Sequence, residues 1–189
     1  MFNQLIECLY KDQGSGKRGK KWFFLRAISN ANYSVLYTFR IGTFLKSHKY
    51  LLIIPYAIIC LWHRWNCYKT GVQLGFGTKI GAGMTIAHYG NIIINDSAEI
   101  GQNCLIFQGV TIGSKRGPKG GTPTIGNNVV LFSGCKILGG VKLGNNVVVG
   151  ANAVVLKDVP DNAVVVGVPA KIVSYNANDT IKYYLTVES

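Results

Sequence analysis

Aliphatic residues recur through residues 74–155 at a nearly constant step of six. The series is Leu74, Ile80, Ile86, Ile94, Ile100, Ile106, Ile112, Ile125, Leu131, Ile137, Leu143, Val149 and Val155. Only two steps differ, eight from Ile86 to Ile94 and thirteen from Ile112 to Ile125. A helix repeats apolar residues about every 3.6 positions and a strand about every two, so a step of six fits neither alone. It predicts a three-sided prism in which each side takes one short strand and one corner.

Three sides of six residues make a coil of eighteen, and the sequence repeats on that scale. The segment "IGNN" at 125–128 returns as "LGNN" at 143–146, which predicts stacked asparagines bonded in a ladder. The related segments that begin at Ile100 and Ile80 precede their successors by 25 and 20 residues. We therefore expect two insertions, one of two residues around His88 and one of seven within the loop 113–124.

The predicted fold is an all-β parallel solenoid in which each coil covers the one beneath it. Four to five coils fit between residues 71 and 160. Small or apolar side chains four positions after most of the aliphatic residues are expected to point inward. They are Thr78, Ala98, Cys104, Val110, Val129, Cys135, Val141, Val147 and Ala153.

Residues 1–70 lack the repeat and differ in composition. They hold eleven Lys or Arg against two acidic residues, so +9 of the total net charge of +12 lies there. One or two helices are predicted over residues 22–45, and the segment 11–21 is predicted to be a solvated loop. The charge alone suggests a scaffold or nucleic-acid-binding role, but no nucleic-acid motif accompanies it.

The segment Tyr50–Trp62 is thirteen apolar residues long and contains Pro55. A membrane-spanning helix needs about twenty. One interpretation is a helix buried against the solenoid or a subunit partner. The other is an interfacial segment on a membrane surface, flanked by Lys46, Lys49 and Arg64.

Other residue types narrow the function classes. Five cysteines without a CxxC pair predict reduced thiols in a cytoplasmic protein. The start "MFNQLIECLY" does not have the pattern of a signal peptide. A zinc site of three histidines is not expected, since His48 and His63 lie outside the repeat.

Several segments together resemble a known family. The hexads, "AHYGNIIIN", the loop after "QGVTIG" and the ending "VVLKDVPDNAVVVGVPAKIV" resemble the left-handed β-helix (hexapeptide-repeat) acyltransferases. The resemblance covers residues 72–173 and is to the serine-acetyltransferase-like branch, closest in character to O-acetyltransferases of capsular and colanic-acid polysaccharides. It implies a left-handed parallel β-helix over residues 71–173, acetyl-CoA as donor without a metal, and a homotrimer with active sites between subunits. Residues 1–70 would form a short helical region and residues 174–189 a C-terminal tail.

The resemblance gives the break at His88 a role. A histidine of this stretch is the general base in the family, and imidazole titrates near neutrality, as that task requires. Asp96, eight residues later, is the candidate for orienting the imidazole. A local bulge can lift a side chain clear of a regular face.

The coil frame places His88, Gln108, Ser133 and Ala151 in one column, with coils spaced by about 4.8 Å. In related galactoside-type acetyltransferases, residues that match Ser133, Ala151 and two lysines contact CoA. Those lysines are Lys157 and Lys171. Their charges suit the phosphates of CoA.

The acceptor side departs from serine acetyltransferases. Two aspartates of that branch are replaced here, by Gln73 and Ala87. The Arg-His pair that binds the serine carboxylate in that branch is also absent, and its positions hold Gly121 and Thr122. The basic loop residues are expected either to bind an anionic sugar or to keep a glycine-rich loop soluble; they are Lys115, Arg116 and Lys119. Gln73 and Gln108 complete the expected acceptor side.

The predicted function is therefore O-acetylation of a sugar hydroxyl on a bacterial surface polysaccharide (capsule, O-antigen or exopolysaccharide) or its precursor. Serine O-acetylation for cysteine synthesis is the enzymatic alternative, and a β-helix scaffold or binding protein is the non-enzymatic one. Residues 1–70 are expected to touch the inner face of the cytoplasmic membrane or an acidic glycan.

Overall fold

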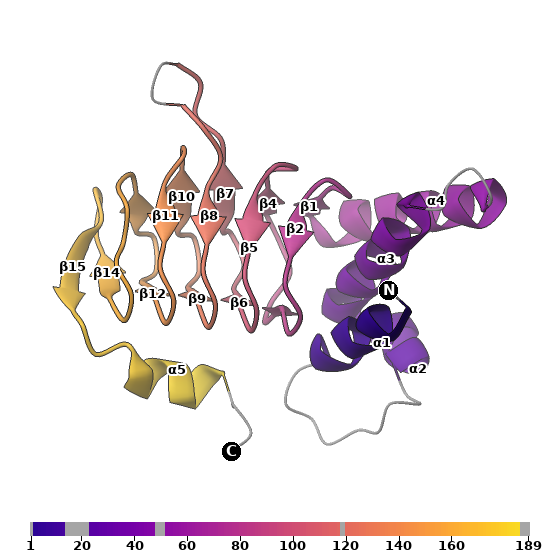
Figure 1. Ribbon diagram of the computed structural model, residues 1–189, viewed down its shortest axis with the longest axis horizontal. Helices are drawn as coiled ribbons and strands as arrows, with labels where there is room; N and C mark the ends of the chain where they lie inside the picture. Colours follow the sequence, from indigo (N-terminus) through magenta and orange to yellow (C-terminus); the bar gives the residue numbers. More distant parts are fainter. Residues whose placement is uncertain (1, 14–22, 48–51, 118–119, 186–189) are drawn as a thin grey trace.

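A helical region joins one end of a long prism of short strands in the computed structural model (Figure 1). The structure describes residues 2–13, 23–47, 52–117 and 120–185. Part of the predicted loop 11–21 and part of the apolar segment 50–62 lie outside the described residues. No helix in the described ranges combines the length and the apolar character that crossing a membrane requires.

Four helices form the N-terminal region. They are α1 (Phe2–Lys11), α2 (Phe23–Ser29), α3 (Ala31–Lys46) and α4 (Ile53–Thr70). The predicted helical stretch 22–45 is thus two helices, divided at Asn30, whose side chain accepts a hydrogen bond from the Tyr33 backbone N–H and caps α3. Gly71 ends α4 in the left-handed conformation, which glycine adopts without a steric penalty.

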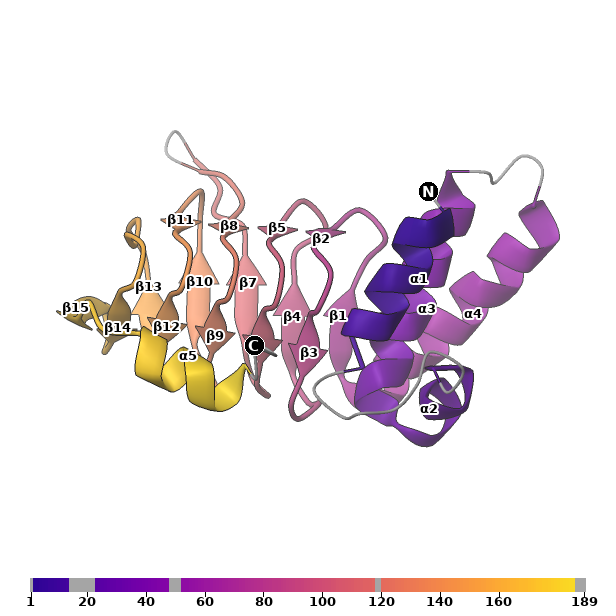
Figure 2. The same ribbon diagram turned by 60° about the horizontal axis from the view of Figure 1, so that its bottom comes forward.

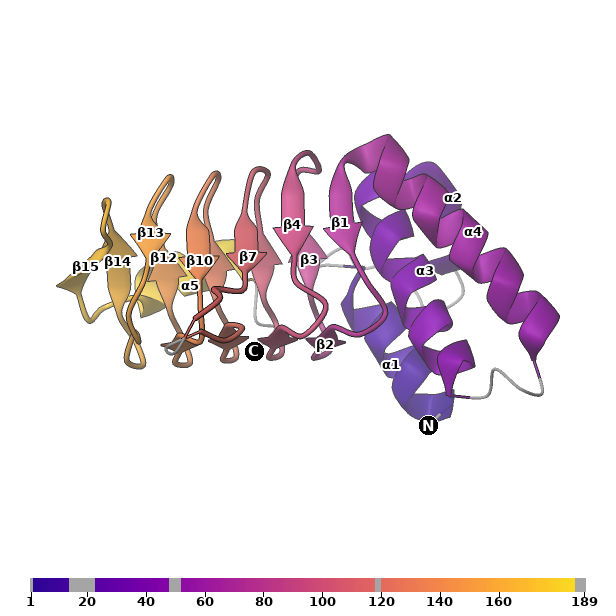
Figure 3. The same ribbon diagram turned by 90° about the horizontal axis from the view of Figure 1, so that it is seen from above.

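The strands form three parallel sheets, one for each side of the prism (Figure 3). Sheet A contains β1 (Val72–Leu74), β4 (Ile92–Ile94), β7 (Thr111–Gly113), β10 (Lys136–Leu138) and β13 (Val154–Val155). Sheet B contains β2 (Lys79–Ile80), β5 (Glu99–Ile100), β8 (Thr124–Ile125) and β11 (Lys142–Leu143). Sheet C contains β3 (Thr85–Ile86), β6 (Leu105–Ile106), β9 (Val130–Leu131), β12 (Val148–Val149), β14 (Val164–Val166) and an antiparallel β15 (Lys171–Ser174).

The strand register confirms the predicted coil and both insertions. In sheet C, Ile106 pairs with Leu131 and Leu131 with Val149, so successive steps are 25 and 18 residues. The first step, from Ile86 to Ile106, is 20 residues. The prediction of a parallel β-solenoid with hexapeptide repeats and a short helical N-terminal region is confirmed.

The interior of the prism is the main core of the protein. All nine residues predicted to point inward are buried, from Thr78 to Ala153. Four asparagines with positive φ stack at one corner and bond side chain to side chain, at 3.2 Å, 3.0 Å and 3.0 Å between Nδ2 and Oδ1. They are Asn103, Asn128, Asn146 and Asn162. The predicted ladder is therefore present.

A buried ion pair ties the helices to the first coil. The guanidinium of Arg40 binds the carboxylate of Asp12, with 2.7 Å between Nε and Oδ2, and donates to the carbonyls of Ile80 and Gly81. The same carboxylate accepts hydrogen bonds from the backbone N–H groups of Gly83 and Met84. Burial raises the pKa of the Asp12 carboxyl, and Arg40 and the two amides oppose that shift. Asp12 thus belongs to the core, although the sequence placed it in a solvated loop.

Helix α4 contradicts the interpretation of a buried segment within a single chain. Only Ile59, His63, Asn66 and Thr70 of this helix are buried. His63 is held by its ring nitrogens, which lie 2.9 Å from the Thr38 hydroxyl and 2.7 Å from the Leu74 carbonyl. Burial lowers the pKa of this imidazole, and the bond to Leu74 acts in the opposite direction.

The described part of the C-terminal tail contains a helix. Helix α5 (Asn178–Tyr184) folds back along the outer face of sheet C (Figure 2). Ala177 and Ile181 pack there on Leu105, Val130 and Val148. Burial of these apolar side chains explains why the chain returns over the solenoid.

Candidate active site

The period breaks at the corner between sheets C and A, and His88 lies in that break. Before the corner, the Ala87 N–H still donates to the carbonyl of Ile106, and after it the Gly109 N–H donates to the carbonyl of Gly90. Strand pairing is therefore regular on both sides, and His88 and Tyr89 are the two extra residues. Both are exposed. The predicted two-residue insertion around His88 is therefore present.

Aromatic rings surround His88 on the outer face of sheet C. Its ring centroid lies 6.2 Å from that of Phe107, which is stacked on Phe132 at 5.2 Å. Tyr184 of α5 meets both phenylalanines edge-on. Within the described part of the chain, no hydrogen bond or ion pair to the imidazole is found. The pairing of Phe107 and Phe132 one coil apart was a signal available in the sequence, whereas nothing there indicated Tyr184.

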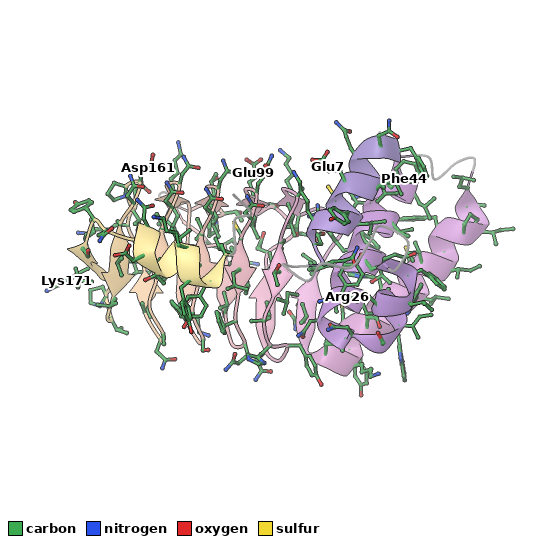
Figure 4. All side chains as sticks on the ribbon, turned by 90° about the horizontal axis from the view of Figure 1, so that it is seen from below. Glu7, Arg26, Phe44, Glu99, Asp161 and Lys171 are labelled. Carbon is green, nitrogen blue, oxygen red and sulfur yellow. The ribbon has the colours of Figure 1, made fainter. Side chains whose placement is uncertain are left out.

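Three members of the predicted column do stack above the break. The carbonyl of Gln108 accepts from the N–H of Gly134, and the carbonyl of Ser133 accepts from the N–H of Asn152. These ladder bonds align Gln108, Ser133 and Ala151 on successive coils. His88 bulges out just below this column. Lys157 and Lys171 are exposed farther along, and Lys171 lies at the end of the solenoid opposite the helices (Figure 4).

Two predicted residues lie away from His88 within the chain. Asp96 follows β4 at the corner between sheets A and B, and its carboxylate covers Gly75 and Gly77 of the coil below. Gln73 is exposed on the outer face of sheet A, paired with Ile93. The structure therefore does not bring either side chain to the imidazole of the same chain.

The inserted loop projects from the corner between sheets A and B (Figure 1). Lys115 and Gly121 exchange two backbone hydrogen bonds of 3.0 Å at its base. Lys115 and Arg116 are exposed, and residues 118–119 lie outside the described residues. Gly121 thus has a structural place in the base of the loop.

Polar side chains from the helical region approach the end of β3, just before His88. The sequence analysis did not predict these contacts. The amide of Asn32 donates to the carbonyl of Ala87 over 3.0 Å. Gln13, which follows Asp12, is buried in the same region with Arg26 nearby. A buried polar pair directly after a helix, at Asp12 and Gln13, has no distinct signal in a single sequence.

Comparison with known proteins begins with the repeat. Residues 122–157 match the family model described as bacterial transferase hexapeptide (six repeats). The matched residues lie within the hexapeptide repeats of the solenoid. This hexapeptide-repeat protein is 43% identical over 105 residues to the serine acetyltransferase of Synechococcus elongatus, which covers 55% of this chain and 43% of that one. It is 44% identical over 106 residues to the serine acetyltransferase of Mycobacterium tuberculosis, covering 55% and 46%. The chain thus matches about half the length of these curated relatives or less.

Solved structures extend the similarity into the helical region. A serine acetyltransferase in complex with CoA has a TM-score of 0.72 at 26% identity, and the match covers 90% of this chain and 70% of that one. The Neisseria gonorrhoeae enzyme in complex with serine has the same TM-score and identity, with coverage of 91% and 70%. The helices therefore belong to the shared architecture.

These relatives correct the predicted acceptor. The sequence-based prediction of a sugar hydroxyl on a surface polysaccharide is wrong, because the relatives at 43–44% identity are serine acetyltransferases. That prediction treated the substitutions at Gln73, Ala87, Gly121 and Thr122 as the loss of all serine recognition. It did not consider polar side chains from the helices, which the fold brings to Ala87.

Proposed function

We propose that this protein is an acetyl-CoA-dependent transferase that acetylates the hydroxyl of serine. The similarity of the solenoid to serine acetyltransferases carries the proposal, since 43% identity spans 105 residues that include the His88 break. The position of His88 on an exposed two-residue bulge supports it independently. Binding of CoA by a structural relative supports acetyl-CoA as the donor.

In the proposed reaction His88 is the general base. The imidazole accepts the proton of the serine hydroxyl as its oxygen attacks the thioester carbonyl. The tetrahedral oxyanion then collapses, the carbon–sulfur bond breaks, and the imidazolium returns the proton to the departing thiolate of CoA. The products are O-acetylserine and free CoA. His88 needs no covalent intermediate for this transfer.

The donor is proposed to lie along the column above His88. Ser133 and Ala151 are two and three coils beyond His88, or roughly 10 Å and 14 Å along the axis at about 4.8 Å per coil. Lys157 and Lys171 continue in the same direction with positive charge for the phosphates. An extended CoA molecule suits this arrangement.

A homotrimer is proposed to complete the site. His88 has no hydrogen-bond partner among the described residues of its own chain, and the loop 113–124 lies at a different corner of the prism, between sheets A and B. A neighbouring chain would supply Lys115 and Arg116 from its loop, and Gln73, Gln108 and Asp96 remain candidates for contacts across the same interface.

The test is direct transfer with the full chain. Purified protein is incubated with acetyl-CoA and L-serine, O-acetylserine is measured by mass spectrometry and free thiol is measured in parallel. Saturable formation of both products in equal amounts is expected. Binding of acetyl-CoA without O-acetylserine formation at any serine concentration would contradict the proposal.

We further propose that α4 places the protein on an anionic membrane surface. Five large apolar side chains are 61–84% exposed on one face of this helix. They are Ile54, Ile58, Leu61, Trp65 and Tyr68, which we call the α4 stripe. Their spacing of four and three residues keeps them in line. Arg64 and Lys69 lie beside them, and the +9 charge of residues 1–70 favours an anionic partner over a second copy of the same region. A cytoplasmic location stays a prediction.

Co-sedimentation with vesicles tests this contact. Binding is expected with phosphatidylglycerol vesicles at low salt and not with phosphatidylcholine vesicles. The double substitution Leu61→Ser and Trp65→Ser should abolish it, whereas Tyr183→Ser, an exposed ring on α5, should leave it unchanged. If the double substitution lowers the molecular mass of the assembly and leaves lipid binding intact, α4 is a subunit contact and the proposal is wrong.

A further inference from the structure

A polar cavity lies between the helical region and the first coil, beside the strand that leads to His88. Its volume is about 220 Å³. Gln13, Arg26, Asn32 and Tyr33 line it from the helices, and Thr85 and Ala87 line it from the solenoid. The cavity therefore adjoins β3, the first strand of sheet C.

Several polar atoms in this cavity have no partner. Both amide atoms of Gln13, the Nε of Arg26 and the Oδ1 of Asn32 are buried without a hydrogen bond within the described residues. Gln13 is only 4% exposed. Buried polar groups in native proteins are ordinarily satisfied, so several unsatisfied atoms at one cavity indicate a polar ligand.

The charge of the cavity favours a ligand that carries a carboxylate. Asp12 also lines it, but its carboxylate is bound by Arg40 and by two backbone amides, so that pair is neutral. Among the described residues that line the cavity, Arg26 is the remaining charged side chain, and its guanidinium is 6.0 Å from the ring centroid of Tyr33, which helps to hold it in place. Arginine binds carboxylates well because its donors form a planar fork.

The cavity shares a face with the imidazole of His88. Ala87, which lines the cavity, immediately precedes His88 and is fixed by the hydrogen bond from Asn32. Ala87 aligns with Phe107 one coil above, and the Phe107 ring lies 6.2 Å from the ring of His88. Figure 4 views this side of the molecule, with Arg26 beside the first coils and α5 along the later ones.

We propose that this cavity binds the amino-acid end of the acceptor and that Arg26 is the residue that recognises its carboxylate. The donor groups of Arg26 and Gln13 face the carboxylate, and the amide oxygens of Gln13 and Asn32 accept from the ammonium group. The hydroxyl then extends past Ala87 toward His88. This inference rests on the proposed function, and it names a source of carboxylate recognition within the chain where Gly121 and Thr122 of the loop provide no charge.

The closing experiment compares L-serine with L-serinamide, which lacks the carboxylate. Steady-state kinetics are measured for the wild-type protein, for Arg26→Gln, and for Lys79→Gln as a control at an exposed lysine of sheet B. In Arg26→Gln the KM for serine should rise about 10- to 100-fold with little change in kcat or in the KM for acetyl-CoA. The preference for serine over serinamide should disappear in Arg26→Gln, whereas Lys79→Gln should retain it. A preference unchanged in Arg26→Gln overturns the inference.

A second variant removes any ambiguity from folding. Gln13→Leu replaces an unsatisfied buried amide by an apolar side chain, so the melting temperature should stay the same or rise while the KM for serine increases. A wild-type KM in Gln13→Leu counts against the inference.

Direct calorimetric binding of serine separates this inference from the proposed function. If the wild-type protein binds serine without acetylating it, and Arg26→Gln loses that binding, the cavity is a serine site and the proposed activity is wrong. If serine binds equally to both proteins, or to neither, the assignment of Arg26 is wrong.

Discussion

His88, the proposed general base, lies in an insertion of two residues in an otherwise regular coil. We expect His88→Ala to lower kcat about 10²- to 10⁴-fold, the usual effect of losing a general base, while acetyl-CoA still binds. Steady-state kinetics and equilibrium binding of acetyl-CoA measure the two quantities separately. A near-wild-type rate in His88→Ala would remove His88 from the mechanism.

His63 should make stability depend on pH. Burial lowers the pKa of His63 in the folded protein. Below about pH 6.5 this imidazole is therefore protonated in the unfolded chain but still neutral in the folded one. The free energy of unfolding should therefore be greatest above that pH and fall as pH decreases through it. The nearby Cys67 thiol has a raised pKa and stays protonated in this range. Urea denaturation between about pH 5 and 7.5 measures the slope.

The control for His63 is a pair of substitutions. His63→Phe should flatten the slope of stability against pH, whereas Tyr183→Phe, at an exposed position of α5, should leave the slope unchanged. An equal slope in wild type and His63→Phe would show that other groups cause the pH dependence.

At the scale of elements, the Asp12–Arg40 pair joins the helices to the solenoid. Asp12→Ala leaves the guanidinium of Arg40 buried without its counter-ion, which costs about 3–5 kcal/mol. It also removes the acceptor for the N–H groups of Gly83 and Met84, so the coil that carries His88 should loosen. Chemical denaturation measures the loss. Glu7→Gln, which breaks an exposed pair with Lys11, should leave the midpoint unchanged.

The hexapeptide repeat made the solenoid predictable from the sequence. The packing of helices α1 and α5 on the solenoid was not predictable in this way. A step of six and the inward positions such as Cys104 and Cys135 follow from local sequence, because each coil contacts only its neighbours. The extra residues at His88 were predictable for the same reason, as a defect in a regular series. Asp12, Gln13 and Tyr184 reach the site through long-range packing of α1 and α5, and no local period records such contacts. The predicted sugar acceptor was wrong for the same reason, because it was inferred from solenoid and loop residues and not from residues of the helices.

At the scale of the whole molecule, sedimentation velocity should give a mass about three times the 20.6 kDa of one chain. Mixing His88→Ala subunits with subunits that lack residues 114–120 should restore part of the activity if each site joins the corner of one chain to the loop of another. A monomer with full activity would contradict the proposed shared site.

The asparagine ladder makes the length of this protein adjustable. Asn128 and Asn146 present the same backbone conformation and the same side-chain bond to their neighbours above and below. A duplicate of residues 128–145 placed before Asn146 would therefore meet matching surfaces on both sides and lengthen the prism by one coil. Lys157 and Lys171 would move about 4.8 Å farther from His88. In the proposed donor site, each added coil would therefore separate the lysines from the phosphates of a donor whose thioester stays beside His88.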